Sequence, residues 1–444
     1  MNLKIYLIVL VSICFSCGNK SKTTPSTTED HGALPPQPNI VFIISDDQSW
    51  TDYSFMGDEH IETPRLDQFA SESLTFTKGY VPTPLCSPSL ATIITGLYPK
   101  DHGIYGNDFV YERIPGDRKA SQRNRAQAYQ PIISAFEKQT TLPELLKEKG
   151  YLSFQTGKWW LGNHKLGGFD YGMTHGDPNR GGRHGDFGLE IGRKGLDTLN
   201  SYVDLALKEK KPFFLWYAPF LPHQPHTPPQ QLLDKYLPKA PTEFIAKYWA
   251  MCEWFDQTCG ALFDLIEAKG QMENTLFVYV CDNGWVQDPN KSTYVNTSKR
   301  APYDLGIRTP IMYKWAGKIQ PKRDDTTVVS SIDMVPTVLD ILAIEKPKNL
   351  PGISVLDSNA LKERKGVFGE VYAHDFDTMD NSIFYNMAFF PPFKIIVPDP
   401  IRKPNEKIQL FNIQSDPFEK NNLADSRPEI IKDLQEKIIA FRAH

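Results

Sequence analysis

Stretches of apolar residues predict four strands before residue 282. They lie at 40–45, 151–155, 212–218 and 276–281, and the first is a continuous apolar run, typical of a strand buried on both faces. Apolar positions at helical spacing from 245 to 266, closed by Gly270, predict a long helix before the fourth strand. Shorter helices are expected at 63–70 and 141–150. Strands that alternate with helices indicate an α/β fold with a large, mostly parallel sheet flanked by helices.

The pattern changes near residue 345. Strand-like runs follow at 367–372, 393–397 and 408–413, and then a capping box at Ser426 and Glu429 opens a final amphipathic helix. We therefore expect a large domain at 39–345 and a smaller C-terminal α+β subdomain at 346–444.

The N-terminus has the pattern of an export signal. Lys4 precedes an apolar core at 5–15 that is too short to span a bilayer, and Ser16-Cys17 resembles a bacterial lipoprotein cleavage site. We expect a signal peptide at 1–17, lipid on Cys17 as the membrane anchor, and a flexible tether at 18–38. The protein would then be an exported bacterial lipoprotein that faces the periplasm or is anchored to the outer membrane. The alternative is an ordinary secretory signal that is cut nearby.

Overall charge and cysteine content restrict the partners. The chain has 49 basic and 53 acidic residues and a net charge of −4, which argues against a nucleic-acid partner and requires any anion binding to be local. Cys252 and Cys259 are too far apart along the long helix to pair, so no disulfide framework is expected.

Polar residues cluster where the predicted strands end. In open α/β sheets, ligands bind outside the carboxyl ends of the strands, so these residues should meet in one crevice. The six residues are Asp46, Asp47, Lys158, His223, Asp282 and Asn283. The four oxygen ligands among them suit a hard divalent cation such as calcium, although either pair alone would more often form a turn.

Cys86 stands just ahead of a short apolar helix that Gly96 ends. A side chain at a helix N-terminus can be held beside an anion, whereas a lone cysteine is more often a buried structural residue. The segment Cys86-Ser87-Pro88-Ser89-Leu90, with Thr95-Gly96, resembles the signature of type I sulfatases, which reads C-x-P-x-R followed by Thr-Gly or Ser-Gly. In that family a maturation enzyme converts the cysteine to formylglycine, whose hydrate is the nucleophile. Leu90 stands where the family has arginine.

The resemblance extends over nearly the whole mature chain. It implies an alkaline-phosphatase-like fold and one Ca²⁺ held by Asp46, Asp47, Asp282, Asn283 and the modified residue 86. Thr156-Gly157-Lys158-Trp159 is similar to the family segment whose lysine contacts sulfate, but Trp160 replaces its histidine. The resemblance also implies that His223 handles the leaving group and that Lys299 binds sulfate. A hydroxyl of the formylglycine hydrate would attack sulfur, and the second hydroxyl would later expel sulfate.

Two arginine-rich segments, 113–125 and 177–194, have no counterpart in these motifs. They are either solvated loops or lie at the mouth of the crevice, where they would favour a sulfated polysaccharide. The candidate substrate-binding residues are His102, Arg180, Arg183 and His184.

Three functions remain open at this point. The first is a calcium-dependent sulfatase that acts on a sulfated carbohydrate. The second is a phosphoester or phosphonate hydrolase of the same superfold. The third is a glycan-binding lipoprotein derived from a sulfatase but catalytically impaired, which the departures at Leu90 and Trp160 motivate.

Overall fold

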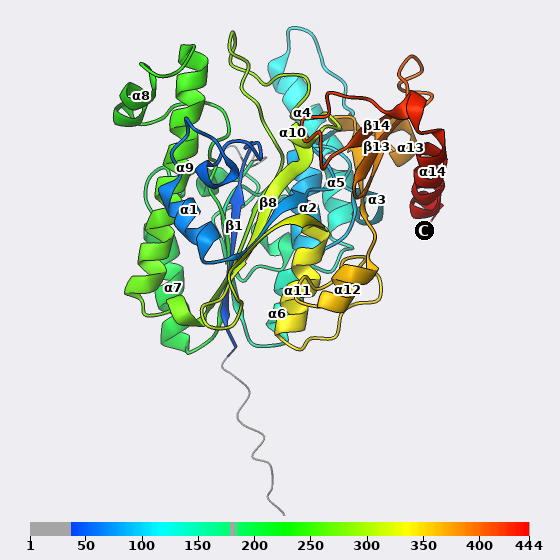
Figure 1. Cartoon of the computed structure of the whole chain (residues 1–444). Coiled ribbons are helices and arrows are strands. Elements are labelled where there is room, and N and C mark those ends of the chain that lie inside the picture. Colours follow the sequence, from blue (N-terminus) through cyan, green and yellow to red (C-terminus); the bar gives the residue numbers. More distant parts are fainter. Residues whose placement is uncertain (1–36, 178–181, 183, 444) are drawn as a thin grey trace, which may run out of the picture. The chain divides into compact units, whose positions relative to one another are not determined.

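A computed structural model describes residues 37–443 except 178–181 and 183, and its centre is an eight-stranded sheet (Figure 1). The strand order is β5-β4-β6-β1-β7-β8-β2-β9. All strands but β8 run in the same direction, since β8 is antiparallel to both of its neighbours. The bounds are β1 (Asn39–Ser45), β2 (Leu74–Tyr80), β4 (Leu152–Gly157), β5 (Tyr171–Gly172), β6 (Phe213–Ala218), β7 (Thr275–Cys281), β8 (Arg308–Lys314) and β9 (Lys322–Ser330). The predicted mostly parallel sheet is confirmed.

Helices cover both faces of this sheet because its central strands are apolar on both sides. In β1, Ile40 and Phe42 belong to one core, and Val41 and Ile43 belong to the other. The first core contains residues of α2 (Cys86–Thr95), α5 (Gln130–Phe136), α6 (Leu142–Lys147) and α11 (Met334–Ile341). The second contains residues of α1 (Pro64–Ser71), α7 (Asp197–Glu209) and α9 (Glu243–Ala268). Figure 1 shows α1, α7 and α9 on the side of the sheet opposite α2, α6 and α11.

Local signals in the sequence fix the ends of several helices. Thr242 caps the long helix α9 by accepting a hydrogen bond from the Ile245 N–H at 3.3 Å, and a capping box of Thr141 and Glu144 opens α6. The remaining helices are α3 (Pro99–His102), α4 (Arg118–Ala128), α8 (Gln230–Tyr236), α10 (Asp304–Ile307), α12 (Ser358–Glu363), α13 (Met379–Ser382) and α14 (Pro428–Ala443).

A second, antiparallel sheet forms most of the C-terminal part. It contains β10 (Val367–Tyr372), β12 (Ile383–Phe390), β13 (Phe393–Pro398) and β14 (Gln409–Asn412), in that order. Helix α14 packs on it through Leu434 and Ile438. The helix begins at Pro428, while the Ser426 hydroxyl donates to the Leu423 carbonyl at 3.0 Å. The predicted smaller α+β part is therefore present.

Two features join this C-terminal part to the main sheet. Lys394 of β13 is buried and contacts Asp304 of α10 at 2.9 Å and Glu419 at 2.5 Å. The short strand β11 (Asp375–Phe376) pairs in parallel with β3 (Asp108–Phe109), which follows α3 in the chain. The boundary at residue 345 stays a prediction.

The predicted signal peptide, Cys17 and most of the tether lie outside the described residues. Within the described part, no helix combines the length and the apolar character that crossing a bilayer requires.

Candidate active site

Two adjacent parallel strands bring the predicted oxygen ligands together. Asp46 and Asp47 directly follow β1, and Asp282 and Asn283 directly follow β7. The Asp282 N–H donates to the Ser45 carbonyl at 3.0 Å, so the pairing of the two strands continues to their ends. All four side chains are buried, and they lie at the carboxyl edge of the sheet, the position that the strand pattern predicts.

Two buried lysines neutralise most of the negative charge. Lys158, which follows β4, is ion-paired with Asp46 and donates to Asp282 at 3.0 Å. Lys299 donates to both carboxylate oxygens of Asp47, at 2.6 and 2.7 Å. Three carboxyl groups thus face two ammonium groups. Burial raises the pKa of Asp46 well above its ordinary value, although Lys158 acts in the opposite direction, so Asp46 is the carboxyl group whose negative charge is least well compensated.

The ion pairs shift the pKa values of the paired groups. Burial acts to raise the pKa of Asp47, but the positive charge of Lys299 outweighs it and holds this pKa below its ordinary value. Burial acts to lower the pKa of Lys158, but Asp282 and Asp46 hold it well above its ordinary value. Both groups are therefore charged at neutral pH.

The backbone at Gly157 allows Lys158 to enter the site. Gly157 has a φ of 83°, and a Cβ at this position would lie 1.9 Å from the Ala218 carbonyl oxygen. The Lys158 N–H donates to the same oxygen at 2.6 Å. Glycine is therefore required for this close approach of β4 to β6.

The oxygen atoms of the site suit a hard divalent cation. Asp46 Oδ2 and Asn283 Oδ1 are buried and have no hydrogen-bond partner among the described residues. The ligand atoms of Asp46, Asp47, Cys86 and His223 all lie within 4.8 Å of one another. Carboxylate and amide oxygens that converge in this way are ligands typical of calcium. The residues present therefore fit the ion that the resemblance implies.

Cys86 is the first residue of α2 and its side chain is 1% exposed. Burial raises the pKa of the Cys86 thiol to about 11, although Lys158 and Lys299 act in the opposite direction. The thiol is therefore uncharged at neutral pH and a poor nucleophile. The neighbouring Ser87 N–H donates to the Asn107 side chain at 2.8 Å, which anchors the start of the helix.

His223 faces the carboxylates through one ring nitrogen. Its Nδ1 lies 2.5 Å from the Gln224 carbonyl oxygen, which can only accept, so Nδ1 carries the hydrogen. The other nitrogen, Nε2, lies 3.4 Å from Asp47 Oδ2. Burial holds the pKa of His223 well below its ordinary value, so the ring is neutral and Nε2 can accept a proton.

A second histidine reaches the site from an earlier segment of the chain, between β5 and α7. His184 packs edge-on against Trp160, with ring centroids 4.5 Å apart, and its ring lies 6.4 Å from that of His223. Its carbonyl accepts a hydrogen bond from the Trp159 N–H at 2.9 Å. The structure therefore brings His184 beside the residue that replaces the family's histidine. Arg180 and Arg183 lie outside the described residues.

His102 does not lie at the mouth of the crevice, and this expectation was wrong. The residue is 0% exposed: its Nδ1 accepts from the Ile104 N–H at 3.0 Å, and its Nε2 lies 3.2 Å from Thr92 Oγ1. It joins α2 to the turn after α3. A histidine just past a helix fits either a surface or a core position, so sequence spacing alone could not decide between them.

Sequence reasoning missed the function of Arg193 and the site neighbours Asn107 and Phe220. The Arg193 guanidinium donates to the Phe220 carbonyl at 2.6 and 3.0 Å and to the His223 carbonyl at 3.2 Å. The Phe220 ring stacks on His223 with centroids 4.1 Å apart. Arg193 thus positions the loop that carries His223. Its place in an arginine-rich segment was the only signal.

The position of Leu90 is filled by apolar packing. Leu90 is 0% exposed and belongs to the same core cluster as Ile93 and Ile94 of α2. The arginine expected from the sulfatase signature therefore has no charged equivalent at this place on α2.

Comparisons with known proteins give the family of the chain. A sulfatase family model matches residues 38–344, and a model described as N-sulphoglucosamine sulphohydrolase, C-terminal, matches residues 294–444. The chain is 26% identical over 383 residues to an ulvan-active sulfatase of Formosa agariphila, a match that covers 78% of this chain and 68% of that protein. It is 27% identical over 366 residues to the N-acetylgalactosamine-6-sulfatase of Canis lupus familiaris, covering 72% and 66%. These matches thus span about two thirds of each relative.

A solved structure shares the fold. The crystal structure of Ps i-CgsB in complex with k-i-k-neocarrahexaose superposes with a TM-score of 0.71 at 21% identity, and the match covers 91% of this chain and 93% of that chain. The alkaline-phosphatase-like fold that the resemblance implied is thus confirmed. Because the sulfatase family model matches well over half of the chain, this protein belongs to the sulfatase family, a group of sulfuric ester hydrolases.

Proposed function

We propose that this protein is a calcium-dependent sulfatase that hydrolyses sulfate esters of a sulfated carbohydrate through formylglycine formed from Cys86. The observation that carries the proposal is the buried convergence of Cys86, His223 and two lysines on one set of oxygen ligands. The relatives are named for ulvan and for N-acetylgalactosamine-6-sulfate, and the solved neighbour contains a neocarrahexaose. Carbohydrate is therefore the substrate class that we propose.

The charge balance of the site supports a bound cation. Two of the three aspartates balance Lys158 and Lys299. Ionisation of the third, Asp46, whose pKa burial raises well above its ordinary value, adds one negative charge, and a sulfate ester would add another. A buried excess of negative charge is costly unless it is compensated. A divalent ion held by the three aspartates and Asn283 would make the site net positive toward the incoming ester and would polarise its oxygens.

The chain's own residues then hold the ester and move the proton. Lys158 and Lys299 are held by different aspartates, so their ammonium groups are preorganised for an anion. Formylglycine at residue 86 would supply the nucleophilic oxygen, which the uncharged thiol cannot. His223 Nε2 exchanges the proton of the leaving sugar oxygen, and its Nδ1 stays bound to the Gln224 carbonyl.

One observation favours a second function. Leu90 packs in the core, so the site lacks the guanidinium of the family signature. A site that still holds sulfate but turns it over slowly or not at all would make the protein a glycan-binding lipoprotein. Binding of sulfated oligosaccharide without turnover, unchanged in Cys86→Ala, would indicate this function.

The experiment that tests the proposal combines peptide mass and turnover. The protein is co-produced with a formylglycine-generating enzyme, and the mass of residue 86 is measured before the protein is assayed for sulfate release from a panel of algal and host glycans. We expect formylglycine and sulfate release, both abolished in Cys86→Ala, and faster hydrolysis of an aryl sulfate than of an aryl phosphate. Faster phosphate hydrolysis would instead favour the phosphoester or phosphonate hydrolase. Confirmed formylglycine without any sulfate release would contradict the proposal.

A further inference from the structure

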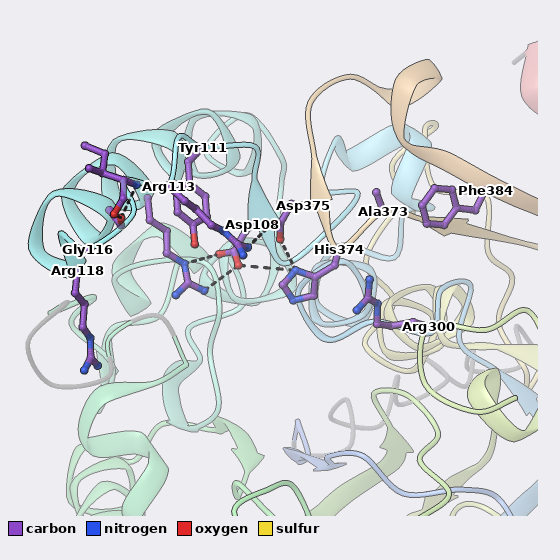
Figure 2. A pocket seen from close by; sticks show the side chains of 13 residues that line it. Asp108, Tyr111, Arg113, Gly116, Arg118, Arg300, Ala373, His374, Asp375 and Phe384 are labelled. Atoms are coloured by element: carbon purple, nitrogen blue, oxygen red, sulfur yellow. Dashed lines mark hydrogen bonds and ion pairs between the residues drawn. The ribbon is translucent and has the colours of Figure 1, made fainter. Parts of the chain in front are cut away.

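A cavity of about 910 Å³ lies outside the candidate active site, between the arginine-rich segment after β3 and residues 373–375 after β10 (Figure 2). Its charged lining residues are Arg113, Arg118, Arg125, Arg300, Asp108 and Asp375. Figure 2 shows Arg300 beside His374 at one end of the cavity, with Arg113 and Arg118 toward the other. Four guanidinium groups therefore face two carboxylates.

Both carboxylates of the cavity are already paired. Arg125 holds Asp108 through two hydrogen bonds of 2.8 and 3.2 Å. Arg113 donates to Asp375 at 3.2 Å, and His374 Nδ1 lies 2.5 Å from the other oxygen of Asp375. Although the Asp108, His374 and Asp375 ligand atoms lie close together, these arginines supply the positive charge that a metal ion would otherwise bring. The cavity suits an anion better than a cation.

Two of the arginines are not engaged by either carboxylate of the cavity. Arg300 and Arg118 have no carboxylate partner among the described residues, and both are exposed to the cavity. A guanidinium binds a carboxylate or a sulfate through two parallel hydrogen bonds, which a lysine cannot reproduce.

The cavity borders the candidate active site. Arg300 directly follows Lys299, and its N–H donates to the Pro84 carbonyl at 3.0 Å, two residues before Cys86. On the other wall, the His374 carbonyl accepts from the Asn107 N–H at 3.0 Å, and the Asn107 side chain accepts from the Ser87 N–H at 2.8 Å. Both walls are thus hydrogen-bonded to the segment around residue 86.

The backbone of Arg300 directs two consecutive cations into different sites. Arg300 has a φ of 66°, in the left-handed region that non-glycine residues rarely adopt. With this conformation, Lys299 pairs with Asp47 in the active site while the side chain of Arg300 lines the cavity. Strained backbone of this kind is retained mainly where function requires it.

We propose that this cavity is a subsite for a second anionic group of the glycan, bound by Arg300 at the end of the cavity that borders residue 86. The group is a further sulfate ester or the carboxylate of a uronic acid, each of which can present two acceptor oxygens to one guanidinium. The inference rests on the proposed function, because it assumes that the ester to be cleaved lies beside residue 86. A glycan that fills both the active site and this subsite carries at least two anionic groups.

The test measures binding by calorimetry in a Cys86→Ala background, so that turnover does not enter. The probes are a monosulfated hexosamine, the same hexosamine with two sulfates, and the monosulfated hexosamine joined to a uronic acid. We expect at least one doubly anionic probe to bind more tightly than the first. Arg300→Ala should weaken binding of that probe by about 10- to 100-fold, the usual range for a lost charge-assisted hydrogen bond. Arg300→Lys should restore part of the affinity.

The controls separate this subsite from other effects. Arg427→Ala removes an exposed arginine outside the cavity and should leave binding of all probes unchanged. Arg300→Gln gives a second variant if Arg300→Ala fails to fold, and it should also weaken the doubly anionic probe selectively. The probe that responds identifies the second group as sulfate or as carboxylate.

Different outcomes would contradict the subsite and the proposed function. Equal affinity for all three probes, or loss of affinity that is uniform across them in Arg300→Ala, would overturn the subsite even if the matured enzyme releases sulfate. Selective, Arg300-dependent binding in a matured protein that releases no sulfate would support the subsite and contradict the proposed function.

Discussion

Leu90 is one helical turn beyond Cys86 and shares its face of α2. We predict that Leu90→Arg increases the fraction of residue 86 found as formylglycine, because the substitution restores the family signature. The same change places a guanidinium in an apolar core and should lower the free energy of unfolding by several kcal/mol, of the order of the desolvation cost of one ion. Peptide mass spectrometry and thermal unfolding measure the two effects.

A matched control for this change is Leu90→Met. It conserves volume and apolar character, so it should cost less than about 1.5 kcal/mol and leave the conversion of residue 86 unchanged. If Leu90→Arg is produced in folded form with no more formylglycine than the wild type, the arginine is not what limits maturation.

The oxygen ligands allow a direct test of the metal. We predict that Asp46→Ala and Asp282→Ala lose bound calcium and activity with little loss of fold, since both residues follow strand ends and lie outside the apolar clusters. Metal content is measured by mass spectrometry after removal of free ions. Asp256→Asn is the control, because this buried aspartate caps α1 through the Leu66 N–H at 2.7 Å. Full calcium stoichiometry in either alanine variant would refute the metal assignment.

His102 makes the fold sensitive to acid. Burial lowers its pKa to about 3, whereas the unfolded chain binds this proton near pH 6.5. Between these values only the unfolded state is protonated at this residue, so the free energy of unfolding falls as the pH falls. The contribution approaches about 1.4 kcal/mol per pH unit.

Replacing His102 should therefore flatten the pH dependence. We predict that His102→Asn, which keeps an acceptor for the Ile104 N–H, has a shallower decline of unfolding free energy from pH 6 to pH 4 than the wild type. Denaturant unfolding at several pH values measures it. The exposed His60 serves as control through His60→Asn, which should keep the wild-type slope. Parallel slopes for wild type and His102→Asn would show that this histidine is not the acid-sensitive group.

At the scale of elements, the loop after β6 depends on one arginine from the preceding connection. We predict that Arg193→Gln lowers kcat by about tenfold or more with a small change in KM. The variant loses charge-assisted hydrogen bonds, worth roughly 1.5 to 3 kcal/mol, to the backbone that positions His223. Steady-state kinetics on an aryl sulfate measure it, and Arg193→Lys should recover part of kcat.

The neighbouring Lys194 offers the control for this loop. Its partner is the exposed Glu190 at 2.9 Å, and surface pairs of this kind contribute about 0 to 1 kcal/mol. Lys194→Gln should leave kcat unchanged. An equal loss in both variants would mean that general charge, and not the position of His223, matters.

The elements differ in how far the sequence could predict them. Strands β1, β6 and β7 are buried on both faces, so their apolar runs in the sequence were enough to predict them. Strand β9 begins with the charged run Lys322-Arg323-Asp324-Asp325 at the edge of the sheet, and β12 shows no clear alternation, so neither was predicted.

The same holds for the site. Its strand-end residues follow from the rule that ligands bind at the carboxyl edge of a parallel sheet. The approach of His184 to Trp160 and the backbone turn at Arg300 depend on how distant loops pack, and no local pattern in the sequence encodes them.

At the scale of the whole molecule, the N-terminal segment leads to a prediction of where the protein resides. We predict that the mature protein partitions into detergent through lipid on Cys17, because the apolar core at 5–15 is too short to act as an anchor. Phase partitioning of wild type and Cys17→Ala measures it, with Cys14→Ala as control. Recovery of Cys17→Ala in the same membrane fraction as wild type would contradict the prediction.

The buried contact of Lys394 with Asp304 and Glu419 limits where segments can be exchanged between this protein and a relative to make a chimera. A chimera that took its last hundred residues from a relative would inherit the relative's residue at the place of Lys394 while keeping Asp304. If that residue is not cationic, Asp304 loses its ammonium partner in a dry interior, at a cost of about 3 to 5 kcal/mol. The crossover points that preserve a working enzyme are therefore those that move Asp304, Lys394 and Glu419 together.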